Sequence, residues 1–192
     1  GQERALRRRI NSVQSTKQIT RAMELIAATR VVKAMTRANA ARPYSTKMTG
    51  VIEDLAAGGV GIDDPLLRSS ETVSSIGFVV ITSDRGLAGA YNSSVIRAAE
   101  KEIMAAQTEG KEYKLVLVGK KAADYFRFRN YQIEASFSGM TDTPSYEDAR
   151  DVATTVRDLF VSEAVDQVIL AYQEFVSMGT QRVAVRKFLP LE

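Results

Sequence analysis

Apolar positions in the first part of the chain recur at helical spacing without staying on one face. Two triplets follow each other at intervals of four and three residues: Leu6, Ile10 and Val13, then Ile19, Met23 and Ile26. The second triplet has moved around the helix axis, whereas a two-stranded coiled coil keeps one seam with a period of about 3.5 residues. The pattern predicts a helix that different neighbours contact from more than one side. A core helix with irregular periodicity is the alternative.

The same segment lacks the residues that end helices. No glycine lies between Gln2 and Thr49, and Pro43 is the single proline. We therefore predict one long helix over residues 1–57, bent at Pro43. At 1.5 Å per residue it would span roughly 85 Å, which is wider than a compact domain of this mass, so we expect it to project as a shaft. Residues 58–75 contain glycine and proline breakers and are predicted to form a linker.

The remaining residues, 76–192, alternate between strand and helix patterns. Strands are predicted at 76–81, 113–118, 131–137, 168–172 and 182–189, and helices at 92–107, at 120–129 and after Ser145. The first strand is a continuous apolar run, as expected for a strand buried on both faces. Ser145 and Asp148 fit a helix-capping box. The order β-α-β-α-β-α-β-β predicts an α/β fold, a Rossmann-like domain with a mostly parallel five-stranded sheet.

Composition narrows the chemistry that the chain can perform. Its 192 residues include no cysteine and no histidine. Disulfides and thiol chemistry are therefore excluded, and so are the usual general base near neutral pH and the commonest metal ligand. No apolar run is long enough to cross a bilayer. The sequence predicts no catalytic residue, no cofactor and no metal site.

Charge is divided unevenly along the chain. Residues 1–50 hold eleven Lys and Arg and two acidic residues, a net charge of +9, so the remaining residues carry −6 of the overall +3. Such a helix fits either nucleic acid or a protein with acidic loops. Residues 1–43 contain no aromatic side chain on which bases would stack, which favours the protein partner.

One loop has the position of a phosphate-binding site but not its sequence. Residues 83–92 follow the first buried strand and precede a helix, where backbone amides often bind phosphate. Neither a dinucleotide fingerprint nor a P-loop is present. We favour a tight structural turn, for which Gly86 and Gly89 provide the flexibility, over a nucleotide site. Asp84 and Arg85 would pair with each other or hold the loop against the long helix.

Three segments carry a resemblance to a known family. They are Arg8–Ala28, with the sequence RRINSVQSTKQITRAMELIAA, then Ala41–Tyr44 and Ser83–Gly89. In these segments and in their order, nearly the whole chain resembles the gamma subunit of the F-type (proton-translocating) ATP synthase. Position 88, often cysteine in that family, is Ala88 here.

The resemblance implies a rotor subunit without a catalytic site of its own. Its implied partners are the alpha and beta subunits of the catalytic head, the epsilon subunit and the membrane c-ring. It would couple proton flow to ATP synthesis or hydrolysis. Lys17, Arg21 and Met23 match the part of the family helix that passes acidic loops of the beta subunits. The implied location is peripheral, on the cytoplasmic face of a bacterial membrane or, alternatively, on the matrix side of the mitochondrial inner membrane.

The resemblance also implies that the long helix is half of an antiparallel coiled coil. The family continues into a second long helix, which pairs with the first. Here the sequence stops at Leu189-Pro190-Leu191-Glu192, so we expect this chain to lack the C-terminal shaft helix.

Overall fold

The computed structural model describes residues 1–57 and 64–191, and the side chains of the first range up to residue 51. The chain divides into two compact units, Gly1–Gly58 and Gly59–Glu192. Part of the predicted linker, residues 58–63, lies outside the described residues.

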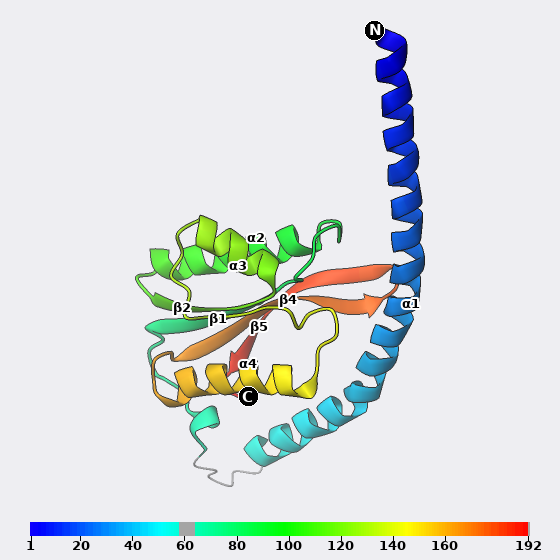
Figure 1. The fold of residues 1–192 in the computed structure, drawn as a ribbon. Helices are drawn as coiled ribbons and strands as arrows, with labels where there is room; N and C mark the ends of the chain where they lie inside the picture. Colours follow the sequence, from blue (N-terminus) through cyan, green and yellow to red (C-terminus); the bar gives the residue numbers. More distant parts are fainter. Residues whose placement is uncertain (58–63, 192) are drawn as a thin grey trace. The chain divides into compact units, whose positions relative to one another are not determined.

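The first unit is a single helix, α1 (Gln2–Ala57) (Figure 1). The hydroxyl groups of its exposed threonines donate hydrogen bonds to backbone carbonyl oxygens one turn earlier, as that of Thr16 does to the Ser12 carbonyl oxygen at 3.0 Å. Pro43 lies inside the helix and removes one backbone donor, yet α1 continues through it and curves in its second half (Figure 1). The predicted long helix is therefore confirmed.

The second unit has the predicted order of elements. They are η1 (Pro65–Leu67), β1 (Ser75–Ile81), α2 (Tyr91–Thr108), β2 (Glu112–Val118), α3 (Lys120–Phe128), β3 (Ala135–Phe137), α4 (Tyr146–Val161), β4 (Gln167–Ser177) and β5 (Thr180–Leu189). The capping box at the start of α4 is present, with Ser145 and Asp148 each bonding the other's backbone N–H. The predicted α/β class is confirmed.

The sheet has the strand order β3-β2-β1-β4-β5 and is parallel except for β5, which pairs antiparallel with β4. Crossovers between parallel strands are right-handed, so the direction of each step along the sheet decides which face its helix covers. The steps β1 to β2 and β2 to β3 run the same way and place α2 and α3 on one face. The step from β3 to β4 runs back and places α4 on the other (Figure 1).

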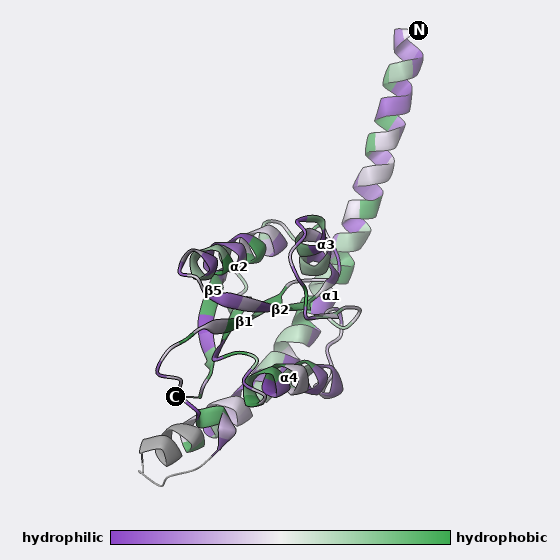
Figure 2. Cartoon of the chain, turned by 90° about the vertical axis from the view of Figure 1, so that its left-hand side faces the viewer, coloured by the Kyte–Doolittle hydropathy of each residue, from purple (hydrophilic) through white to green (hydrophobic). Residues whose placement is uncertain are grey.

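Each face of the sheet has its own core. One core packs Phe78, Ile103 and Phe126 between the sheet and helices α2 and α3. The other packs Val79, Val168 and Phe160 beneath α4. Because both faces are covered, β1 is apolar from Ile76 to Ile81, as its sequence predicted. On α1, by contrast, hydrophobic and hydrophilic residues are interspersed along the visible side (Figure 2).

Two strands differ in length from their predicted ranges by four residues or more. β3 covers only residues 135–137 of the predicted 131–137, although Tyr131 and Ile133 still pack against the core. β4 extends to Ser177 rather than Tyr172, because its outer half forms a hairpin with β5. Within the predicted linker, Pro65–Leu67 forms a short 3-10 helix capped by Asp64.

Candidate functional site

The exposed apolar side chains of α1 are the first candidate site. Eight large apolar residues between positions 6 and 32 are exposed, from 41% for Met23 to 65% for Leu25: Leu6, Ile10, Val13, Ile19, Met23, Leu25, Ile26 and Val32. They include both triplets that the sequence placed on different faces. An apolar surface of this extent is typical of a site that binds another protein.

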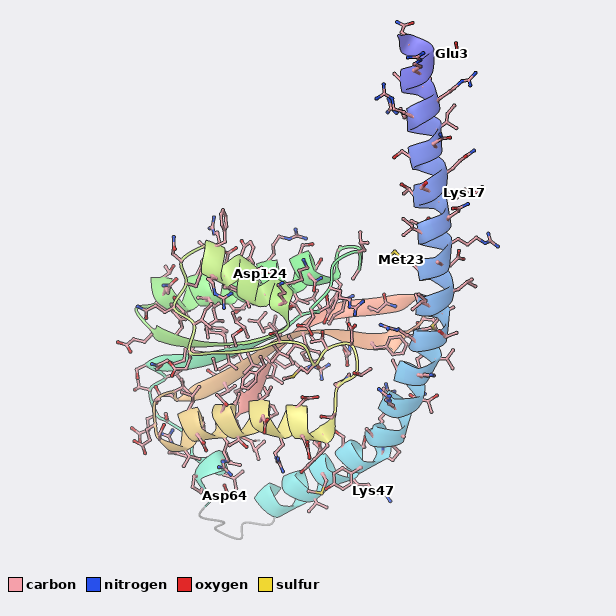
Figure 3. The ribbon with its side chains drawn as sticks, in the orientation of Figure 1. Glu3, Lys17, Met23, Lys47, Asp64 and Asp124 are labelled. Carbon is pink, nitrogen blue, oxygen red and sulfur yellow. The ribbon has the colours of Figure 1, made fainter. Side chains whose placement is uncertain are left out.

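The three predicted contact residues do not share one side of α1. Lys17 and Arg21 are four residues apart and therefore neighbour each other on one face. Met23 follows Lys17 by six residues, about 120° away around the axis. In Figure 3 the labelled Met23 lies to the left of the ribbon and Lys17 to its right. The helix thus presents a basic pair on one side and an apolar residue on another.

The loop after β1 is the second candidate site, and Asp84 is its centre. One carboxylate oxygen of Asp84 accepts from the backbone N–H of Lys120 at 2.9 Å. The other accepts from the backbone N–H and the hydroxyl of Thr141, at 3.0 and 2.7 Å. The N–H of Asp84 donates to the Thr141 hydroxyl oxygen at 2.8 Å. Asp84 therefore joins three segments of the second unit that are far apart in sequence.

These bonds also set the charge of Asp84. Partial burial alone would raise its pKa, but the hydrogen bonds from Gly139, Thr141 and Lys120 outweigh burial and lower the pKa to about 2. The carboxylate is therefore ionised at all physiological pH values.

The rest of the loop is also held by protein groups. The Ser83 N–H donates to Asn92 Oδ1 at 2.9 Å, and the Asn92 amide donates to the Arg85 carbonyl oxygen. Arg85 forms an ion pair with Asp142 at 2.7 Å, so the first of the two alternatives, a pairing of Asp84 with Arg85, is wrong. The second, contact of the loop with the long helix, stays a prediction. The backbone amides of Ser83 and Lys120, which follow the carboxyl ends of β1 and β2, already bind side chains of the protein. The loop is built as a structural junction.

Sequence reasoning missed the partners of this junction. Thr141 and Asp142 lie 57 residues beyond Asp84 and Arg85, in a segment with no motif. The importance of Gly119 could have been inferred from the sequence, because this glycine directly follows a buried strand. A Cβ atom at Gly119 would lie 2.3 Å from the Thr82 carbonyl oxygen.

The described residues include neither a cluster of metal ligands nor a membrane-spanning helix. Among them, no group of three or more acidic side chains is placed to hold a metal ion. No helix of the described chain is long and apolar enough to cross a membrane.

Comparison with known proteins gives a consistent result. The model of the family described as ATP synthase matches residues 2–192. The chain is 45% identical over 195 residues to the ATP synthase gamma chain of Frankia casuarinae, covering 100% of this chain and 65% of that protein. It is 44% identical to the ATP synthase gamma chain of Kineococcus radiotolerans, again with 100% and 65% covered. The chain thus spans about 65% of the length of these two relatives.

A solved structure shares the fold. It is the central stalk and c-ring of the mitochondrial ATP synthase from Tetrahymena thermophila, which this chain matches with a TM-score of 0.54 and 22% identity. The match covers 79% of this chain and 71% of that chain.

Proposed function

The chain belongs to the ATP synthase gamma chain family, and from this premise we propose that it works as the central-stalk rotor subunit of an F-type ATP synthase. It would couple proton flow through the membrane c-ring to ATP synthesis or hydrolysis in the alpha and beta subunits of the catalytic head. The chemistry would take place in the beta subunits. The exposed surface of α1 is the observation that carries this proposal.

The arrangement of side chains on α1 supports a rotor more than a static strut. A strut that binds one partner would present one continuous apolar stripe. On α1 the apolar triplets lie on different faces, and the basic pair Lys17 and Arg21 points away from Met23. An asymmetric shaft makes different contacts with each of several surrounding sites. Differential contact is what a conformational change in those sites requires.

The exposed basic residues of α1 support weak electrostatic contacts that can break and re-form as the shaft rotates. Lys17 is exposed, as is Arg21. Ion pairs between exposed groups contribute only about 0.2 to 1 kcal/mol each, so they can guide a moving surface without arresting it. We assign Lys17 and Arg21 to electrostatic contact with acidic loops of the beta subunits, and Met23 to apolar contact.

The α/β unit would then serve the opposite end of the rotor. We assign it to docking of the epsilon subunit and the c-ring. The protein would lie peripherally on the cytoplasmic face of a bacterial membrane, since the relatives from Frankia and Kineococcus are bacterial.

Charge substitutions in the assembled complex test the proposal. We expect Arg21→Glu and Met23→Lys to lower ATP-driven proton pumping in membrane vesicles about twofold or more relative to ATP hydrolysis in the same vesicles. The matched controls, Arg21→Lys and Met23→Leu, should leave that ratio unchanged. Affinity purification with the tagged protein must recover alpha, beta and epsilon subunits for every variant. If the ratio of proton pumping to ATP hydrolysis is unchanged in both charge variants, the proposed contact residues are wrong. If the tagged wild-type protein recovers no partner subunits, the proposed rotor role is wrong.

A further inference from the structure

A hollow of about 410 Å³ lies between α4 and the carboxyl ends of β1 and β2, and the residues that line it all belong to the second unit. Its walls come from four strands, from α4 and from the loop before α4. The apolar lining consists of Val79, Ile81, Val118, Met140, Pro144, Ala149, Val152, Ala153, Val156, Leu170 and Phe188. The volume falls within the range of small-molecule sites.

Three of the four polar side chains in the lining already have partners. The Thr82 hydroxyl accepts from the Ala122 N–H and donates to the Val118 carbonyl oxygen. Thr141 is bound to Asp84, and the Asp148 carboxylate accepts from Ser145 in the capping box. The protein itself therefore satisfies these three polar side chains, and none of them requires a charged ligand.

The fourth polar side chain, Tyr91, is different. Its ring packs partly buried against the core beneath α2, and it also lines the hollow. Among the described residues, its hydroxyl has no hydrogen-bond partner, unlike those of Tyr125 and Tyr131, which both donate to Glu100. Burial raises the pKa of Tyr91, so the hydroxyl stays protonated and can donate.

We propose that this hollow binds a small, uncharged and mostly apolar molecule that carries one hydrogen-bonding oxygen, which pairs with the Tyr91 hydroxyl. The apolar walls give affinity through burial, and Tyr91 fixes the orientation. A charged ligand is disfavoured because the lining offers no counter-charge other than Asp148, which Ser145 occupies.

The position in the sheet fits a ligand site. The hollow lies at the carboxyl end of β1, which has β2 on one side and β4 on the other. From β1 the chain crosses first to β2 and later back to β4, so strand order reverses at this point. In open α/β sheets, ligands bind outside the carboxyl ends of strands at such a reversal.

A titration with two matched probes tests the proposal. The probes are 2-naphthol, which carries a hydroxyl, and naphthalene, which does not. Methyl resonances of Val152 and Leu170 in the purified protein report binding. We expect saturable shifts with both probes. Tyr91→Phe should weaken 2-naphthol binding about three- to tenfold, the effect of one lost hydrogen bond, and leave naphthalene binding unchanged.

A cavity-filling variant and its control complete the experiment. Ala153→Phe should abolish binding of both probes, whereas Ala105→Phe places the same side chain on the exposed side of α2 and should change nothing. The proposal is overturned if neither probe shifts these methyls up to its solubility limit, or if Tyr91→Phe weakens both probes equally. Contacts from Val152 and Leu170 to a protein segment outside residues 64–191, seen without probe, would also overturn it, since the hollow would then be filled.

Discussion

The Asp84 carboxylate shows how one residue fixes a junction between remote segments. It accepts hydrogen bonds from backbone N–H groups at the start of α3 and in the loop before α4, and Asp84 itself lies in the loop after β1. Its pKa of about 2, below the ordinary 3.8, means that folding favours the charged form. The stabilisation is complete above the unfolded pKa of about 3.8 and is lost as the pH falls through about 2.

Replacing this carboxylate should weaken the second unit in a pH-dependent way. We expect Asp84→Asn to lower the free energy of unfolding at pH 7 by about 1 to 2 kcal/mol, after allowance for solvent screening of this partly exposed group. The difference from wild type should shrink as the pH approaches 2. Urea unfolding followed by tyrosine fluorescence measures it. Asp124→Asn, on the exposed side of α3 (Figure 3), is the control and should change stability by less than about 0.5 kcal/mol.

Gly119 is required for a different reason, because no side chain fits there. Its φ angle is +96°, and an added Cβ would lie 2.3 Å from the Thr82 carbonyl oxygen. Gly110 has a φ of +76° with open space around it. We expect Gly119→Ala to cost about 3 kcal/mol or more and Gly110→Ala only about 1 kcal/mol, since the second carries backbone strain alone. Equal losses in urea unfolding would show that the close approach to Thr82 is unimportant.

The sequence could predict contacts between residues that are close together in the chain, but not contacts between residues that are far apart in it. The capping box of Ser145 and Asp148 spans three residues and follows a known pattern, so it was predicted. The contacts of Asp84 with Thr141 span 57 residues and depend on how the sheet brings two loops together. No local pattern encodes such a pair. The same argument applies to the proposed contact residues Lys17, Arg21 and Met23, whose proposed partners lie outside the chain.

At the scale of elements, strands buried on both faces were the easiest to predict. β1 is apolar from Ile76 to Ile81 and β2 from Leu115 to Val118, and the observed bounds of both strands agree with prediction within one residue. β3 was predicted too long, because Tyr131 and Ile133 alternate like strand residues but pack against the core without pairing. β4 was predicted too short, because its outer part, residues 173–177, mixes polar and apolar residues and is held by a hairpin with β5.

The large apolar side chains of α1 are mostly exposed, so intrinsic helix propensity contributes more to its stability than burial within the described chain does. We expect the isolated chain to self-associate through them or to fray at the N-terminus, with rapid amide exchange over residues 5–40 at low concentration. Sedimentation velocity should show association that weakens about tenfold or more in Ile19→Gln/Ile26→Gln. The control Ala27→Gln/Ala28→Gln should associate like wild type. A monomer with uniformly protected amides along residues 5–40 would contradict this expectation.

For the whole molecule, the two units differ in how they are stabilised. Among the described residues, the members of both hydrophobic cores all come from Leu66 onward, so these cores belong to the second unit. Residues 1–58 hold eleven basic and four acidic residues, a net charge of +7, and the remaining residues carry −4, so the two units differ in charge as well. A fold with such a division is suited to a protein whose parts meet different partners.

This division predicts that residues 64–192 fold without α1. Six of the seven tyrosines lie in that range, Tyr44 being the exception, so tyrosine fluorescence reports almost entirely on the second unit. We expect the urea midpoint of residues 64–192 to agree with that of the whole chain within about 0.2 M, because the cores are complete. A midpoint lower by about 1 M would mean that α1 stabilises the sheet domain directly. The apolar faces of α1 would then serve its own chain as well as its partners.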